Sequence, residues 1–158
     1  MTRALLMRPS TLVPWSSDWV WSLPLIVVTV IFHAYSLGLL KHLVSVILKL
    51  AKNRDLAGVL SLSVVGGTAL CAAVLHGIET AIWAIAYSLL GALPDRKIAM
   101  LYSLGAMTTF GIDGLMLDAQ WRLMGSLEAL NGWILFGLTT AFLFTVIQDV
   151  WLHGNSRP

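Results

Sequence analysis

Four apolar stretches, separated by short polar segments, organise this chain and predict its helices. The first runs from about residue 19 to 48, and the last runs from about 123 to 147. Each contains the roughly 20 consecutive apolar residues with which a helix crosses a bilayer. The second runs from about 56 to 93 and would be roughly 55 Å long as a helix. That length is too short for two crossings and a turn, so we expect one long helix that is tilted or projects into the cytoplasm.

The third apolar stretch, residues 98–107, is too short to cross a bilayer, and it leads directly into TTFGIDG, residues 108–114. A short apolar helix followed by glycine-rich backbone is typical of a segment that enters the membrane and returns on the same side. Irregular backbone at membrane depth must be buried in protein or line water, and a single helix hairpin cannot enclose it. We therefore expect several copies of the chain to form a ring with these loops at its centre.

The composition supports a membrane location. The chain has 158 residues, of which 58% are hydrophobic and 11% are charged, and its mean hydropathy is +0.82. Soluble domains have roughly 25% charged residues, so we expect an all-α integral membrane protein with the lipid bilayer as a partner. The net charge of +2 is too small to indicate binding to nucleic acid. The lone Cys71 cannot form an intramolecular disulfide.

Basic residues predict the orientation of the chain in the membrane. The densest positive cluster is KLAKNRD, residues 49–55, between the first two apolar stretches. Positively charged loops stay in the cytoplasm, so three crossings place the N-terminus outside and the C-terminus in the cytoplasm. His153 and Arg157 agree with this orientation, whereas Arg3 and Arg8 count mildly against it.

The segment after residue 100 combines several features in a fixed order. LYSLGAMTTFGIDG, residues 101–114, places two threonines and then a glycine after a short apolar helix. WRLMGSLEALNGWILFGLTTAFLF, residues 121–144, then begins a long helix that carries Gly132 and Gly137. In this order and spacing the segment resembles the pore module of tetrameric potassium channels. It is most similar to bacterial two-transmembrane relatives, whose filter region reads TTLGYGD.

The resemblance implies both a fold and an activity. It covers about residues 56–151, which would form an outer helix, a re-entrant pore helix, a selectivity filter and an inner helix within a homotetramer. The filter would consist of Thr108, Thr109, Phe110, Gly111, Ile112, Asp113 and Gly114. Backbone carbonyls of residues 109–112 and the Thr109 hydroxyl would replace the hydration shell of a permeant ion. The implied activity is passive conduction of K⁺ across a bacterial inner membrane, with Na⁺ or a divalent cation as other permeant ions.

The filter departs from the family pattern at its centre. Relatives have G-Y-G-D where this chain has Gly111, Ile112, Asp113 and Gly114. The hydroxyl of the usual tyrosine is lost, and the second glycine is an aspartate. Aspartate tolerates left-handed backbone better than most residues, so the loop can still form. A fourfold ring would bring four carboxylates near the axis, which favours cations and can favour divalent ones.

The segments outside the filter are assigned as follows. Residues 1–18 form an N-terminal interfacial segment, residues 19–55 an extra transmembrane helix and basic cytoplasmic loop, and residues 152–158 a short C-terminal tail. The aromatic belt at the first bilayer interface would comprise Trp15, Trp19 and Trp21. Glu128 would brace the filter from behind, with help from Asn131, or would face water at the outer mouth. On the inner helix, Thr140 and Phe144 would line and gate the pore, and Gly132 would be a close-packing position or a bend that gates the pore.

His76 and Glu79 lie one turn apart on the second apolar stretch and face the same side. An ionisable residue inside a membrane span indicates function, because its burial is costly. The alternative is a buried pair that bonds internally, to Tyr87 or to the pore helix, and so supports the filter. A metal site would need more ligands than these two.

Other classes of function have weaker support. Within the sequence, no helix carries arginine at every third position, so we expect no voltage sensor. No serine–histidine or cysteine–histidine arrangement indicates nucleophilic catalysis, so we expect neither an enzyme nor a cofactor. The alternatives to a potassium-like pore are a non-selective or divalent-permeable channel, a non-conducting structural homologue, and an intramembrane enzyme that uses His76 and Glu79.

Overall fold

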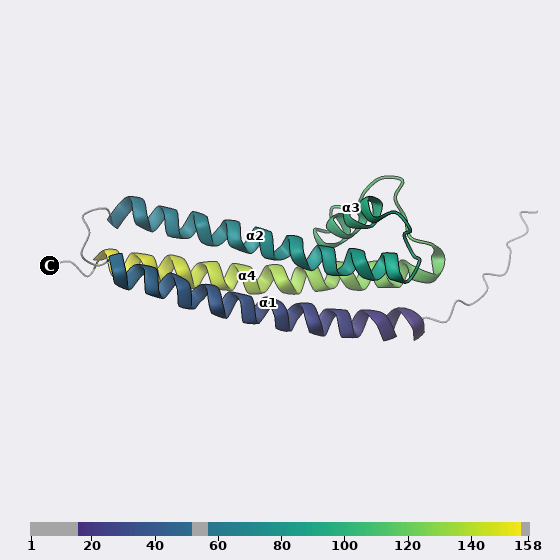
Figure 1. The fold of residues 1–158 in the computed structure, drawn as a ribbon, viewed down its shortest axis with the longest axis horizontal. Coiled ribbons are helices and arrows are strands. Elements are labelled where there is room, and N and C mark those ends of the chain that lie inside the picture. Colours follow the sequence, from purple (N-terminus) through teal and green to yellow (C-terminus); the bar gives the residue numbers. More distant parts are fainter. Residues whose placement is uncertain (1–15, 52–56, 156–158) are drawn as a thin grey trace, which may run out of the picture.

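Three of the four apolar stretches form long helices in the computed structural model, which describes residues 16–51 and 57–155 (Figure 1). They are α1 (Ser16–Ala51), α2 (Ala57–Leu89) and α4 (Arg122–Asn155). The third stretch forms the short helix α3 (Arg96–Met107), and the 3₁₀ turn η1 (Ala119–Trp121) leads into α4. The three long helices are long and apolar enough to cross a membrane. The prediction of an all-helical membrane protein with three spanning helices is therefore confirmed.

Some predictions fall on residues that the structure does not describe. They concern the N-terminal residues 1–15 with Trp15, the basic residues 52–55, and Arg157 in the tail. The second apolar stretch forms one helix, as expected, since α2 continues without a break for 33 residues. Helix α4 continues to Asn155 and so passes residue 151, where the pore module was expected to end.

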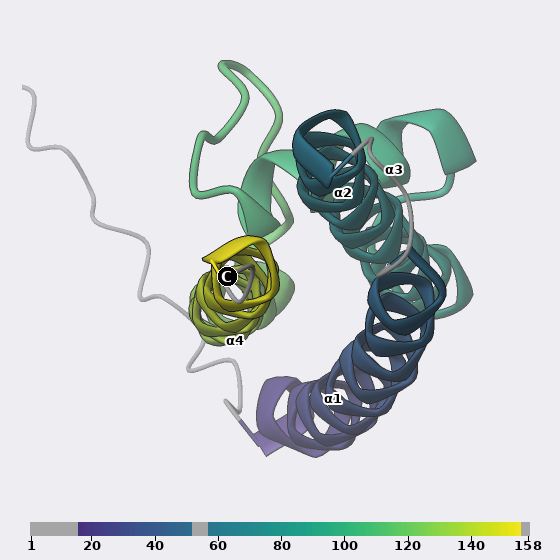
Figure 2. The ribbon, with the colours of Figure 1, turned by 90° about the vertical axis from the view of Figure 1, so that its left-hand side faces the viewer.

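The three long helices form an open arc, and α3 lies near one end of these helices. Helix α1 packs against α4 and α2, and α3 packs against α2 and α4. Figure 1 shows α3 and the loop that follows it at the end where α2 finishes and α4 begins. The view along the helices shows α4 at one side of the arc formed with α1 and α2 (Figure 2). One face of α4 is consequently left uncovered by the other described helices.

A sharp reversal after α2 brings α3 back against it. Gly91 has a positive φ of 69°, which glycine adopts without steric cost. Asp95 then caps α3, because its side chain accepts hydrogen bonds from the backbone N–H groups of Lys97 (2.8 Å) and Ile98 (2.9 Å). The sequence GALPDRK therefore ends one helix and begins the next within a few residues.

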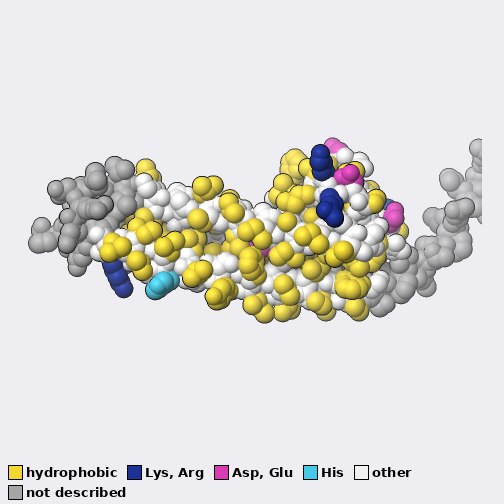
Figure 3. Space-filling model, in the orientation of Figure 1, with side chains coloured by type: hydrophobic (Ala, Val, Ile, Leu, Met, Phe, Trp, Pro, Cys, Tyr) yellow, Lys and Arg dark blue, Asp and Glu magenta, His cyan; other side chains and the backbone are white. Residues whose placement is uncertain are grey.

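The outer surface of the helices is apolar, as a lipid environment requires. Large hydrophobic side chains are exposed along the three long helices, including Val20 and Ile31 on α1, Leu62 and Leu70 on α2 and Trp151 on α4. Figure 3 shows hydrophobic side chains along the whole length of the visible face, with acidic and basic side chains near α3 and a further basic side chain and a histidine near the opposite end. This distribution agrees with a protein whose long helices are surrounded by lipid.

Candidate functional site

The loop after α3 has an unusual backbone. Positive φ angles occur at Thr109 (56°), Gly111 (66°) and Gly114 (75°). Glycine enters this region readily, but a β-branched residue such as threonine does so only when its surroundings impose it. Asp113 was expected to tolerate the left-handed backbone of the family's second glycine, but Gly114 adopts it instead. The left-handed positions within G-I-D-G are therefore its two glycines.

Two backbone hydrogen bonds fasten this loop to the end of α3. The N–H of Gly111 donates to the carbonyl of Gly105 (3.0 Å), and the N–H of Thr109 donates to that of Ala106 (2.9 Å). A Cβ on Gly105 would lie 3.0 Å from Cγ1 of Ile112, so the loop packs directly on the helix there. The Ile112 side chain thus points back toward α3. Gly105 was not identified from the sequence, where it is simply a glycine within a short helix.

The predicted filter residues are largely exposed in the single chain. Thr108, Thr109, Gly111 and Asp113 are all exposed, and Phe110 has 87% of its surface accessible. The Thr108 hydroxyl donates to the carbonyl of Leu104 (2.7 Å), which also accepts the helical hydrogen bond from the Thr108 N–H (3.1 Å). An exposed phenylalanine beside exposed backbone indicates a surface that something else covers.

Helix α4 touches α3 at two glycines. A Cβ on Gly132 would lie 2.1 Å from the Met107 carbonyl oxygen, and one on Gly125 would lie 2.1 Å from the Tyr102 hydroxyl. The two positions are seven residues apart and so lie on the same face of α4. Of the two roles considered for Gly132, the structure shows close packing, since this buried glycine lets α4 contact the end of α3 and also lines the cavity described below.

Glu128 on α4 connects that helix to α2 and α3. It is fully buried, and one of its oxygens accepts a hydrogen bond from the Tyr87 hydroxyl on α2 (2.7 Å). Its other oxygen accepts from the Ser103 hydroxyl on α3. The prediction left open whether Glu128 faces water or braces the filter. It faces no water, and it holds the short helix that carries the loop.

Asn131 was expected to help support the filter, and the contact that the structure shows for it is with α1. Its side chain is buried, and Nδ2 donates to the Thr29 hydroxyl on α1 at 2.9 Å. Thr29 in turn donates to the Leu25 carbonyl (2.8 Å), which orients its oxygen toward the amide. Asn131 therefore fastens the N-terminal helix to α4.

The uncovered face of α4 carries the remaining predicted pore residues. Thr140 is exposed, as are the aromatic side chains of Trp133 (70%), Phe136 (69%) and Phe144 (61%). Residues 133, 136, 140 and 144 recur every three or four positions, so they form one stripe along the helix. Thr140 and Phe144 therefore share one exposed face of α4, whereas Gly132 is buried.

A cavity of about 740 Å³ lies beneath the loop. Thr108 and Thr109 line it from the end of α3, His76 lines it from α2, and Trp133 and Phe136 line it from α4. Most of its wall is apolar, while the threonines and the histidine supply polar groups. The last carbonyl groups of α3 carry the negative end of that helix dipole, so this position favours a cation.

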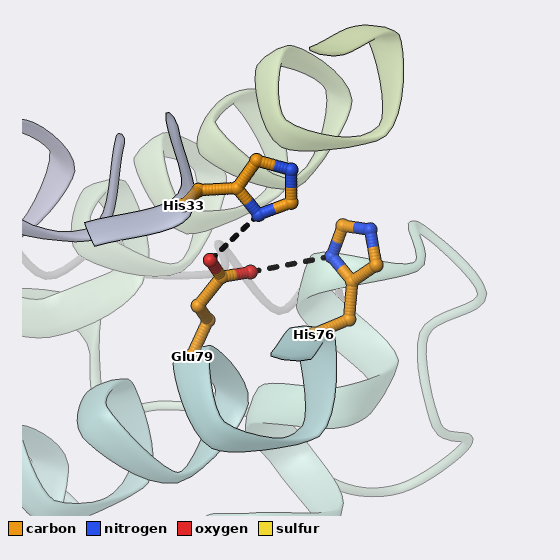
Figure 4. Close-up of side chains that lie close together, drawn as sticks. All are labelled: His33, His76 and Glu79. Atoms are coloured by element: carbon orange, nitrogen blue, oxygen red, sulfur yellow. Dashed lines mark hydrogen bonds and ion pairs between the residues drawn. The ribbon is translucent and has the colours of Figure 1, made fainter. Parts of the chain in front are cut away.

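His76 and Glu79 belong to a larger polar cluster that the sequence did not show (Figure 4). The buried His33 on α1 places its Nδ1 2.7 Å from Oε1 of Glu79, and Nδ1 of His76 lies 3.3 Å from Oε2. Thr139 on α4 completes the cluster, with its hydroxyl oxygen 3.0 Å from Nε2 of both histidines. We define these four residues as the His33 cluster.

The His33 cluster changes the predicted partners of His76 and of Glu79. His76 and Glu79 were expected to support the filter or to bond to each other, to Tyr87 or to the pore helix. They do contact each other, but their further partners lie on α1 and α4, and Tyr87 bonds to Glu128. His33 is an ionisable residue inside the first apolar stretch, so the reasoning applied to His76 and Glu79 would have identified it.

Comparison of the chain with family models, with curated proteins and with solved structures finds no match.

Proposed function

We propose that this protein is the pore subunit of a passive cation channel, in which four copies surround a central filter made by residues 108–114. The observation that carries the proposal is the loop itself. It leaves the end of a short helix, packs back on it at Gly105, and has left-handed backbone at Thr109, Gly111 and Gly114. A backbone of this kind, exposed at one side of a membrane protein, needs neighbouring copies to enclose it.

The orientation of Ile112 supports a filter rather than a surface turn. Its side chain packs on α3, where Gly105 leaves room for it. The Ile112 carbonyl itself accepts a hydrogen bond from the Leu115 N–H (3.1 Å), so the ring we propose would consist of the carbonyls of residues 109–111, which face away from the supporting helix. A ring of such carbonyls can replace the water around a cation.

The uncovered face of α4 supports a multimer. Trp133, Phe136 and Phe144 are between 61% and 70% exposed in the single chain, and Phe110 on the loop is 87% exposed. Four copies placed with these faces inward would cover the aromatic side chains nearest the loop and leave Thr140 and Phe144 along a central path. The negative end of α3 would then face the same path, which favours cations over anions.

Asp113 favours a channel that also admits or binds divalent cations. Its carboxylate is exposed, and it stands where relatives of the potassium-channel family have glycine. Four such carboxylates near one axis would attract divalent cations more strongly than monovalent ones. We therefore retain divalent permeation or divalent block as the second candidate function on the same fold.

Gly111→Ala tests the proposal. Alanine at a φ of +66° is strained, so the variant should conduct little or no cation current in planar bilayers, at the same protein density as wild type. The matched control is Gly91→Ala, which meets the same backbone strain at φ +69° but lies in the turn between α2 and α3. Neither added Cβ would have another atom within 4 Å.

The pair separates a pore effect from a loss of stability. Both variants should lose similar stability, but only Gly111→Ala should lose current. Equal currents in the two variants, or a wild-type protein without cation current under any gradient, would contradict the channel and favour a non-conducting structural role. A monomer in a membrane-like environment would contradict the enclosure argument.

A further inference from the structure

We propose that the His33 cluster is a binding site for a Zn²⁺-class divalent metal ion, with His33, His76 and Glu79 as its ligands. The site would join α1 to α2 and, through Thr139, to α4. This proposal does not rest on the channel, since it concerns side chains that pack between the long helices.

The donor atoms already converge. Nδ1 of both histidines faces the Glu79 carboxylate, and one donor atom from each of the three residues lies within 4.8 Å of the others (Figure 4). Zn²⁺ binds imidazole nitrogen and carboxylate oxygen at about 2.0–2.2 Å, so neighbouring ligand atoms stand about 3.3 Å apart. The His76–Glu79 distance of 3.3 Å fits this spacing. The His33–Glu79 distance of 2.7 Å would have to widen by about 0.6 Å.

A count of hydrogens shows that the cluster lacks one positive charge. Its four contacts join each histidine once to Glu79 and once to Thr139. Two neutral imidazoles and one hydroxyl supply one hydrogen each, and a carboxylate supplies none. Three hydrogens cannot fill four contacts, so at one contact two lone pairs must face each other without a hydrogen between them.

The unfilled contact can be located. Oε2 of Glu79 is buried and has no hydrogen-bond partner within the described residues, although Nδ1 of His76 lies 3.3 Å away. A fully buried carboxylate with an unpaired oxygen at membrane depth is costly unless a cation neutralises it. A metal ion beside Oε2 would supply that charge and accept the lone pairs of both Nδ1 atoms.

Thr139 allows the tautomers that metal binding needs. Its oxygen lies 3.0 Å from Nε2 of each histidine and can accept a hydrogen bond from both. When a metal ion replaces the hydrogen bond from His33 to Glu79, both Nε2 atoms can carry the ring hydrogen and both Nδ1 atoms can present lone pairs to the ion. This is the second-shell arrangement by which a hydrogen bond on one ring nitrogen orients the other toward a metal.

An entry path exists on one side of the site. His33 and Glu79 are fully buried, but the His76 side chain is 24% exposed and lines the cavity beneath the loop. A cation in that cavity would therefore meet His76 first. Two histidines and one carboxylate leave a fourth coordination position, which water from the cavity can fill.

The experiment is a Zn²⁺ titration of the chelator-treated full-length protein by calorimetry, combined with X-ray absorption of the loaded protein. We expect one Zn²⁺ per chain, with nitrogen or oxygen neighbours at about 2.0–2.1 Å and the scattering pattern of two imidazoles. Thr139→Val should weaken binding about 10–100-fold, and His33→Gln should weaken it further, whereas Thr139→Ser should restore it. The matched control is His42→Gln, an exposed histidine on the same helix, which should bind as wild type does.

Because His33 is buried, His33→Gln must first be shown to be folded. If this variant does not fold, X-ray absorption of the wild type decides whether histidines bind the Zn²⁺. Failure of the wild type to bind Zn²⁺ stoichiometrically, or equal binding by folded His33→Gln, would overturn the proposal. A proton would then supply the missing charge, and nitrogen NMR of the histidines would show one ring protonated at both nitrogens. Neither result depends on whether the protein conducts ions.

Discussion

Gly132→Ala should destabilise the protein because it would force α4 away from the end of α3. The added Cβ would lie 2.1 Å from the Met107 carbonyl oxygen and 2.8 Å from its carbonyl carbon. These are backbone atoms, so the clash can be relieved only by moving one helix relative to the other. Overpacking of this kind costs about 1–3 kcal/mol.

The size of the effect is clearest against a matched glycine. Gly66 lies in the interior of α2, and a Cβ there would meet no other atom within 4 Å. Gly66→Ala should therefore gain up to about 1 kcal/mol, the intrinsic preference of alanine over glycine in a helix. The two variants should differ by about 2–4 kcal/mol in free energy of unfolding. Gly125→Ala should fall between them, because its neighbour is the hydroxyl at the end of the Tyr102 side chain.

Thermal unfolding in one detergent, followed by circular dichroism, measures this ranking. For a chain of this length about 1 kcal/mol corresponds to about 2–4 °C, so Gly132→Ala should melt several degrees below Gly66→Ala. Trimming the neighbouring side chain with Met107→Ala should not rescue Gly132→Ala, since the contact is with the carbonyl group. If Gly132→Ala melts with Gly66→Ala, or if Met107→Ala rescues it, the two helices do not meet at this glycine.

Two further substitutions test the surroundings of the loop. Tyr87→Phe removes the 2.7 Å hydrogen bond to Glu128 and should lower the free energy of unfolding by about 1–3 kcal/mol in the same melting assay. The control Tyr35→Phe, at an exposed position on α1, should cost close to nothing. Equal melting temperatures of the two variants would mean that Glu128 does not depend on Tyr87. Asp113→Asn should lower cation current and divalent block at low ionic strength, with an effect that shrinks as salt screens the carboxylates, and unchanged currents at low salt would place this side chain away from the ion path.

The helices themselves were predictable because bilayer thickness and apolar length are both visible in a sequence. The first span was expected over residues 19–48 and forms Ser16–Ala51, and the short helix was expected over residues 98–107 and forms Arg96–Met107. The ends were less predictable. The last helix was expected to finish near residue 147 but runs to Asn155, because polar residues such as Gln148 and Asp149 do not by themselves stop a helix.

The contacts that hold the site could not be read from local spacing. His33 meets Glu79 from 46 positions away, and Asn131 meets Thr29 from 102 positions away. Gly105 lies within the short helix, and nothing near it in the sequence indicates that Ile112 will pack on it. Such roles depend on which helices become neighbours, and a single sequence without that pairing leaves them undetermined.

Polar contacts between helices explain why α1 takes its place in this arrangement. Apolar packing selects helix neighbours only weakly in a bilayer, because lipid tails are as apolar as leucine. Helix α1 is joined to α2 by the contact of His33 with Glu79, and to α4 by His33 with Thr139 and by Thr29 with Asn131. Glu128 on α4 joins that helix to α3 through Ser103 and to α2 through Tyr87. The helix that the potassium-channel resemblance left without a role is thus fastened, through Glu79 and His76, to the wall of the cavity beneath the loop. A change in the charge of the His33 cluster would act on both the position of α1 and the cavity, because the same side chains belong to each.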